Sequence, residues 1–188
     1  MNLPTILGTD DRIRILAAVL ASETSTHSGN AALIRVQAIA MRAKVSKGLV
    51  SRYLVILQKE GVLRRSGTAY VLINGPETKA VRILLSLNNL ARFPFRNYPA
   101  ITAVGLYGSA AKGTNTASSD IDLWIRTTTT DLTTLSTITG DMHRTLGPVT
   151  PLYLTDEKLE MLKTSDPMFY HALYFGSIVI YGDGLDAS

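Results

Sequence analysis

The chain has 188 residues, no cysteine and a hydrophobic content of 46%, enough to form one or two buried cores. Without cysteine it forms no disulfide bonds or zinc-thiolate sites, and it has no cysteine nucleophile. No apolar run approaches the roughly 20 residues that span a bilayer. Asp10 and Asp11 also stand where a secretion signal would carry positive charge. We therefore expect a cytoplasmic protein that makes no contact with a membrane.

Positive charge is concentrated in the first part of the chain. Residues 1–75 contain ten Lys or Arg and four Asp or Glu, a formal charge of +6, whereas the remainder carries −2. Such asymmetry favours a nucleic-acid partner for the basic part.

Residues 10–74 have the pattern of a small helical domain that ends in a hairpin. Ser46 is a good N-cap for a helix that runs to about Glu60 and stops at Gly61. Two β-prone runs around a Ser-Gly-Thr turn predict the hairpin. In order, we expect a helix capped by Asp10 or Asp11, a polar loop at 22–30, a strand at 32–36, helices at 37–43 and 46–60, and a hairpin at 62–73.

In the 46–60 helix, Val50, Leu54 and Leu57 share one face, so we expect them to point inward. The whole pattern resembles the winged helix-turn-helix domain of prokaryotic regulators. That resemblance implies binding of double-stranded DNA, with one set of residues in the major groove and another on the phosphates. The first set is Lys47, Ser51 and Arg52, and the second is Arg64 and Arg65. The alternative is that these are solvated polar side chains, or a surface that contacts protein.

Residues 76–94 are predicted to connect two domains. The run from Glu77 to Leu90 has apolar residues on more than one side of a helix. This pattern favours a rigid link or a homodimer contact over a flexible linker.

Residues 106–125 are the most informative stretch of the chain. An apolar strand at 101–107 ends at Gly108 and Ser109, where the turn into a helix presents backbone N–H groups to an anion, and Lys112 can add a positive charge. A second strand starts at Asp120. Because side chains alternate along a strand, Asp120 and Asp122 share a face, and two converging carboxylates suit Mg²⁺ and a nucleoside triphosphate.

Gly-Ser, ten residues and Asp-x-Asp resemble the signature of the nucleotidyltransferase superfamily typified by DNA polymerase beta, and more closely the minimal nucleotidyltransferases of prokaryotes. The resemblance implies that Asp120 and Asp122 are catalytic and bind one or two Mg²⁺ ions. It also implies that the substrate is a nucleoside triphosphate, preferably ATP, and that Gly108 and Ser109 bind its β- and γ-phosphates. Ser119 joins Lys112 among the nucleotide-binding candidates. The acceptor would be a small molecule or a protein, including a toxin-like partner.

Active members of that superfamily usually carry a third carboxylate on a later strand, which helps to deprotonate the attacking hydroxyl. The corresponding strand here is predicted at 149–154 and contains no acid, because Asp156 and Glu157 fall in the next helix after a Thr155 cap. Two functions therefore remain open. One is an active nucleotidyltransferase; the other is a transcriptional regulator whose degenerate domain only binds a nucleotide, a metal or a partner protein.

The rest of the chain completes a small sheet domain. We expect helices at 132–146, 156–163 and 167–174, a strand at 178–181, and Trp124 in the core. The predicted class is α/β (α+β): a winged helix-turn-helix domain plus a mixed sheet with helices packed on one face. The predicted domains are residues 1–75, a connecting helix at 76–94, and residues 95–188.

Overall fold

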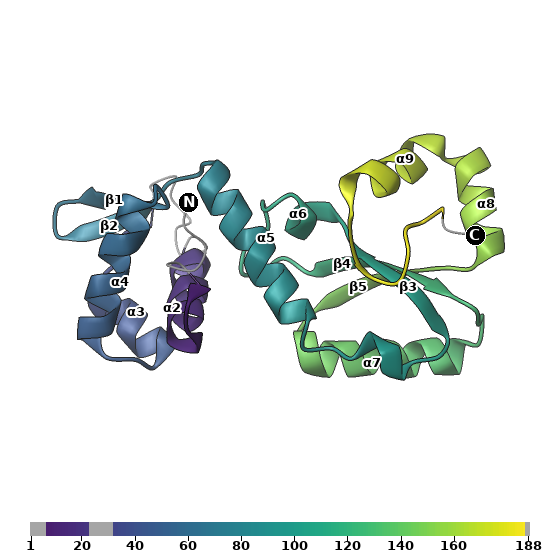
Figure 1. Cartoon of the computed structure of the whole chain (residues 1–188), viewed down its shortest axis with the longest axis horizontal. Helices are drawn as coiled ribbons and strands as arrows, with labels where there is room; N and C mark the ends of the chain where they lie inside the picture. The colour runs from purple at the N-terminus through teal and green to yellow at the C-terminus, as the bar shows by residue number, and fades with distance from the viewer. Residues whose placement is uncertain (1–6, 23–31, 187–188) are drawn as a thin grey trace. The chain divides into compact units, whose positions relative to one another are not determined.

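The computed structural model describes residues 7–22 and 32–186, and the backbone divides into two units (Figure 1). The first comprises Met1–Leu85 with Asn115–Ser118, and the second Ser86–Thr114 with Ser119–Ser188. Most of the polar loop expected at 22–30 lies outside the described residues. Among the described residues, no helix is both long and apolar enough to cross a bilayer.

The first unit contains helices followed by a hairpin. Its described elements are α2 (Asp10–Leu20), α3 (Val36–Ala43), α4 (Lys47–Lys59), β1 (Leu63–Ser66) and β2 (Ala69–Leu72). The N-cap of α2 is Thr9, whose side chain accepts a hydrogen bond from the N–H of Arg12. The expected cap at Asp10 or Asp11 is wrong, because both residues already have helical geometry and lie in the first turn, where their charge favours the helix dipole.

Helix α4 is confirmed as predicted. The side chain of Ser46 accepts a hydrogen bond from the N–H of Leu49, 3.3 Å away, and so caps the helix. The expected inward residues Val50, Leu54 and Leu57 are fully buried. They belong to one apolar core that also takes residues from α2, α3 and the hairpin.

The hairpin is also confirmed, since β1 and β2 pair antiparallel. The strand expected at 32–36 is wrong. Only Ile34 pairs, in a single bridge to Tyr70 with N···O distances of 2.7 and 2.9 Å. Ile34 is buried but Leu33 is 53% exposed, and Val36 already begins α3, so this run is too short to form a strand.

Helix α5 (Pro76–Leu90) contains the whole run from Glu77 to Leu90 that was expected to be helical, and it ends four residues before the predicted connecting segment does. Val81 and Leu85 belong to the core of the first unit. Leu87 and Leu90 belong to a core of the second unit. The apolar residues on several sides of this helix are therefore used in two separate cores.

The second unit is built on a mixed sheet with strand order β5-β4-β3-β6. Strand β4 runs antiparallel to β3 and parallel to β5, and the connection from β4 to β5 passes through α7. Its described elements are η2 (Phe95–Asn97), β3 (Ile101–Leu106), α6 (Gly108–Ala111), β4 (Ile121–Thr127), α7 (Leu132–Leu146), β5 (Val149–Leu154), α8 (Asp156–Ser165), α9 (Pro167–Gly176) and β6 (Ile178–Tyr181).

Helices cover both faces of this sheet (Figure 1). On one face, Leu123 and Ile125 of β4 pack in a core that contains residues of α7. On the other, Trp124 packs in a core that contains residues of α8 and α9. The prediction of helices on one face is wrong, because the alternation of β4 presents a large apolar residue to each side.

Candidate active site

The turn after β3 brings the backbone into a conformation that favours glycine. Tyr107 is extended, and Gly108 has φ +68° as the chain enters α6. The first turn of a helix leaves N–H groups without an intrahelical partner, and these suit an anion. Ser109 follows within the same turn and is half-buried.

Antiparallel pairing of β3 and β4 places this turn against the aspartate pair. Leu106 pairs with Leu123, and the N–H of Tyr107 donates to the backbone carbonyl oxygen of Asp122 at 3.0 Å. A Cβ added to Gly108 would lie 2.2 Å from Oδ2 of Asp122. The carboxylate of Asp122 therefore touches the Gly-Ser turn directly.

The carboxylates of Asp120 and Asp122 interact electrostatically. The pKa of Asp122 is raised above its usual range, first by burial and then by the negative charge of Asp120. Burial, followed by the charge of Asp122, also raises the pKa of Tyr107. Asp120 is exposed and lies just before β4, and its Oδ2 accepts a hydrogen bond from Oγ1 of Thr150 at 3.3 Å.

No carboxylate of β5 joins this pair. The parallel register aligns Asp122 with Thr150 and Trp124 with Leu152. Within residues 7–22 and 32–186, no group of three or more His, Cys, Asp or Glu side chains could hold a metal ion. Asp156, the first acid after β5, lies in α8 and pairs with Arg126 at 2.8 Å.

The carboxylate pair nevertheless has the chemistry of a Mg²⁺ site. Mg²⁺ is commonly held by one or two carboxylates together with substrate phosphates and water. Asp120 is exposed and Asp122 is half-buried, so both can contribute oxygen ligands. Burial and the negative charge of Asp120 raise the pKa of Asp122, and a bound cation would favour the ionised form of both carboxylates.

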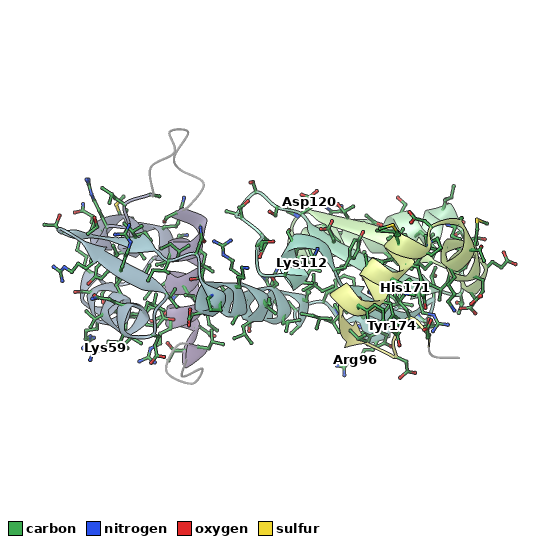
Figure 2. The ribbon with its side chains drawn as sticks, turned by 90° about the horizontal axis from the view of Figure 1, so that it is seen from above. Lys59, Arg96, Lys112, Asp120, His171 and Tyr174 are labelled. Atoms are coloured by element: carbon green, nitrogen blue, oxygen red, sulfur yellow. The ribbon has the colours of Figure 1, made fainter. Side chains whose placement is uncertain are left out.

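Two further nucleotide-binding candidates lie within the spacer between the two halves of the motif. Lys112 is exposed directly after α6 (Figure 2). Ser119 is half-buried and directly precedes Asp120. Gly108, Ser109, Lys112, Ser119, Asp120 and Asp122 all belong to the second unit.

Sequence reasoning missed the contacts that Thr150 and Tyr107 make with the aspartate pair. The Gly-Ser-Asp pattern gave no signal for either residue. Thr150 was visible only as a polar residue in an apolar strand, and its neighbour on β4 depends on strand register, which a single sequence does not fix.

The five DNA-binding candidates lie in the first unit and are all exposed. Lys47, Ser51 and Arg52 are on α4, away from its buried stripe. Arg64 and Arg65 are adjacent on β1. The guanidinium of Arg65 lies 5.7 Å from the centre of the Tyr70 ring and also donates to the carbonyl oxygen of Gly67.

Comparisons with known proteins give one family match. The family model described as Polymerase beta, Nucleotidyltransferase matches residues 90–183. A similar solved structure is the tri-AMPylated Shewanella oneidensis HEPN toxin in complex with MNT antitoxin. The similarity covers 54% of this chain and 73% of that chain, with 15% identity and a TM-score of 0.35. No curated protein gives a significant match. The family match includes both the Gly-Ser turn and the aspartate pair, and the chain belongs to the polymerase beta nucleotidyltransferase family.

Proposed function

We propose that the chain is a cytoplasmic Mg²⁺-dependent nucleotidyltransferase that transfers AMP from ATP to a hydroxyl group of a protein or small molecule. The observation that carries this proposal is the contact of Gly108 with the carboxylate of Asp122. It joins an anion-binding turn to a pair of acidic metal ligands, the combination that a nucleoside triphosphate requires.

Each candidate residue has a role in this reaction. Asp120 and Asp122 would hold Mg²⁺, and Gly108 and Ser109 would bind the β- and γ-phosphates, with Lys112 and Ser119 alongside. Bound Mg²⁺ would neutralise charge on the triphosphate and on the leaving group. The acceptor oxygen forms a bond to the α-phosphorus, the bond from that phosphorus to the bridging α–β oxygen breaks, and pyrophosphate leaves. Because β5 supplies no carboxylate, the proton of the acceptor hydroxyl passes to water.

Label transfer tests the activity. The purified chain is incubated with Mg²⁺ and α-³²P-ATP, with and without lysate of the source cells, beside the Asp120→Asn/Asp122→Asn double variant. We expect a labelled acceptor with the native chain and none with the double variant. Bound ATP without any labelled product or released pyrophosphate would instead favour a regulator whose second unit binds a nucleotide, a metal or a partner protein without turnover.

The exposed basic side chains of the first unit support a second function. We propose that residues 1–75 form a winged helix-turn-helix domain that binds double-stranded DNA as a transcriptional regulator. Residues 76–94, with α5 as their helical part, would then connect this domain to the nucleotidyltransferase domain at residues 95–188. The proposal is supported by the charge of +6 on residues 1–75 and by a hairpin that follows α4. A homodimer would present two such domains to two half-sites.

Fluorescence anisotropy with a labelled mixed-sequence duplex at low salt tests DNA binding. Lys47→Glu and Arg52→Glu should each weaken binding, because an attraction to the duplex becomes a repulsion. Lys59→Glu is the matched control, because Lys59 is exposed in the last turn of the same helix and was not assigned to DNA (Figure 2). Equal losses in all three variants would indicate a general charge effect and would contradict a recognition role for α4.

A further inference from the structure

A groove on the second unit runs along the last strand of its sheet. Its volume is about 640 Å³, and it is lined by Leu87, by residues 90–96 and by all four residues of β6. Side chains of a strand leave on alternating faces. Because the groove touches every residue of β6 and not only those on one face, it follows the edge of the strand along its length.

Strand β6 is an edge of the sheet. It pairs with β3 alone, and the strand order leaves its other side without a strand among the described residues. Alternate backbone N–H and C=O groups of an edge strand point away from the sheet and can pair with an added strand. The side chain of Val179 is also 45% exposed here.

The floor of the groove is apolar and well packed. Phe93 and Phe95 are almost fully buried, and the Phe95 ring stacks on that of Tyr181 with centroids 6.2 Å apart. These aromatic contacts tie the segment after α5 to β6 and keep the two walls of the groove in place. The groove can therefore receive a ligand without first being formed.

The charge along the groove has one sign. Arg92 and Arg96 are the charged residues that line it, and no acidic residue does so. Both are exposed, and Arg92 donates to the side chain of Asn89, which itself donates to the carbonyl oxygen of Leu146 at 3.1 Å. Arg96 forms no ion pair with any residue that the structure describes.

We propose that this groove binds an extended acidic segment of a partner protein, which adds to the sheet along β6. The free edge supplies the backbone pairing, the apolar floor accepts alternate side chains, and Arg92 and Arg96 select negative charge. A second copy of the chain fits less well, because pairing β6 with β6 would bring four arginines together.

Peptide binding tests the proposal with the full chain. The probe is a short fluorescein-labelled peptide that alternates glutamate with valine, and the comparison peptides replace glutamate with lysine or carry N-methyl groups on alternate backbone nitrogens. We expect the acidic peptide to bind in fluorescence anisotropy, and both comparison peptides to lose at least about tenfold in affinity. N-methylation leaves the charge unchanged, so it isolates the backbone pairing.

Charge reversal in the chain locates the binding. Arg92→Glu and Arg96→Glu should each weaken binding of the acidic peptide roughly tenfold, because an attraction becomes a repulsion. Lys158→Glu makes the same charge change at an exposed position of α8 outside the groove and should leave affinity unchanged. Tryptophan fluorescence of each variant verifies that the second unit is folded.

Three results would overturn the proposal. They are no binding of the acidic peptide at about 1 mM, binding that survives N-methylation, and equal losses in the groove variants and in Lys158→Glu. Sedimentation that reports a dimer strengthened by Arg96→Glu, which removes part of the repulsion between the four arginines, would assign the groove to a second copy instead. Nucleotide binding does not enter these measurements, so they are independent of the proposed transferase activity.

Discussion

Gly108 lies against the carboxylate of Asp122, so closely that a Cβ on the glycine would be 2.2 Å from Oδ2. The same glycine has φ +68°, a conformation that residues with a side chain rarely adopt. Two independent constraints therefore require glycine here. One comes from the backbone of the turn and the other from the acid that the turn touches.

Substitution of Gly108 should damage both stability and the site. Gly108→Ala should lower the free energy of unfolding by about 2 to 4 kcal/mol, from backbone strain and the clash with Asp122, and should abolish ATP binding. Urea unfolding followed by the fluorescence of Trp124, the single tryptophan, measures the first effect. Gly147→Ala is the control: Gly147 also has positive φ, but an added Cβ would meet nothing within 4 Å. The Gly147→Ala variant should be destabilised yet still bind ATP. Loss of ATP binding in Gly147→Ala equal to that in Gly108→Ala would contradict a local role for Gly108.

Ionisation of Asp122 should oppose folding. Because its pKa is raised in the folded chain, the unfolded chain ionises at lower pH, and stability falls as pH rises from about 4 through the raised pKa. Asp122→Asn should therefore raise the urea midpoint of the second unit at pH 7 in the absence of Mg²⁺. The difference should disappear at about pH 3, where the wild-type carboxyl is protonated in both states.

Asp131 provides a control, because its pKa is shifted in the direction opposite to that of Asp122. Hydrogen bonds from Thr134 and Thr133 hold its pKa below the usual range, so its charge stabilises the folded state above the pKa of the unfolded chain. Asp131→Ala should lower the midpoint at pH 7, and this loss should shrink as pH falls through the depressed pKa. If the two variants shift the midpoint in the same direction, the assigned electrostatic environment of Asp122 is wrong.

A carboxylate introduced at Thr150 should strengthen Mg²⁺ binding. Thr150 is aligned with Asp122 and donates a hydrogen bond to Asp120, so Thr150→Asp would place a third acid beside the pair. Without metal the variant should unfold at lower urea, because like charges repel. Calorimetric titration should show Mg²⁺ bound about tenfold more tightly. Thr150→Asn adds bulk without charge, and an equal gain in Mg²⁺ affinity in that variant would contradict the metal-site assignment.

The hydrogen bond of Trp124 should contribute to the stability of the second unit. Trp124 is fully buried, and its indole N–H donates to Oγ of Ser177 at 2.9 Å. Ser177→Ala would leave this donor unpaired in the core, and should lower the free energy of unfolding by about 1 to 3 kcal/mol. Ser118→Ala, at an exposed position, should change it by less than about 0.5 kcal/mol. A similar effect in both variants would mean that the indole N–H finds another partner.

Local chemistry made much of the fold predictable. The Ser46 cap and the glycine after Glu60 bracket α4, and the Thr155 cap sets the start of α8, because caps act within a single turn. The turn at Gly108 and the alternation of Asp120 and Asp122 are equally local, so the two halves of the candidate site could be read separately.

Contacts between distant segments were not predictable in the same way. The alignment of Thr150 with Asp122 depends on the register of two strands joined through α7, and the second helical layer depends on which elements meet Trp124. Even the cap of α2 was decided by backbone geometry, because Thr9, Asp10 and Asp11 are all good capping residues.

The antiparallel pairing of β3 with β4, and not the spacer between Ser109 and Asp120, sets the distance between the Gly-Ser turn and the aspartate pair. The end of β3 and the start of β4 are held together by the ladder, with Leu106 opposite Leu123. The span of the intervening loop therefore need not fix the distance between the phosphate turn and the acids. Related chains could lengthen or shorten this loop and keep the same site. A search for such sites is better guided by two matched apolar strands, one ending in Gly-Ser and the other beginning with Asp-x-Asp, than by a fixed number of residues between them.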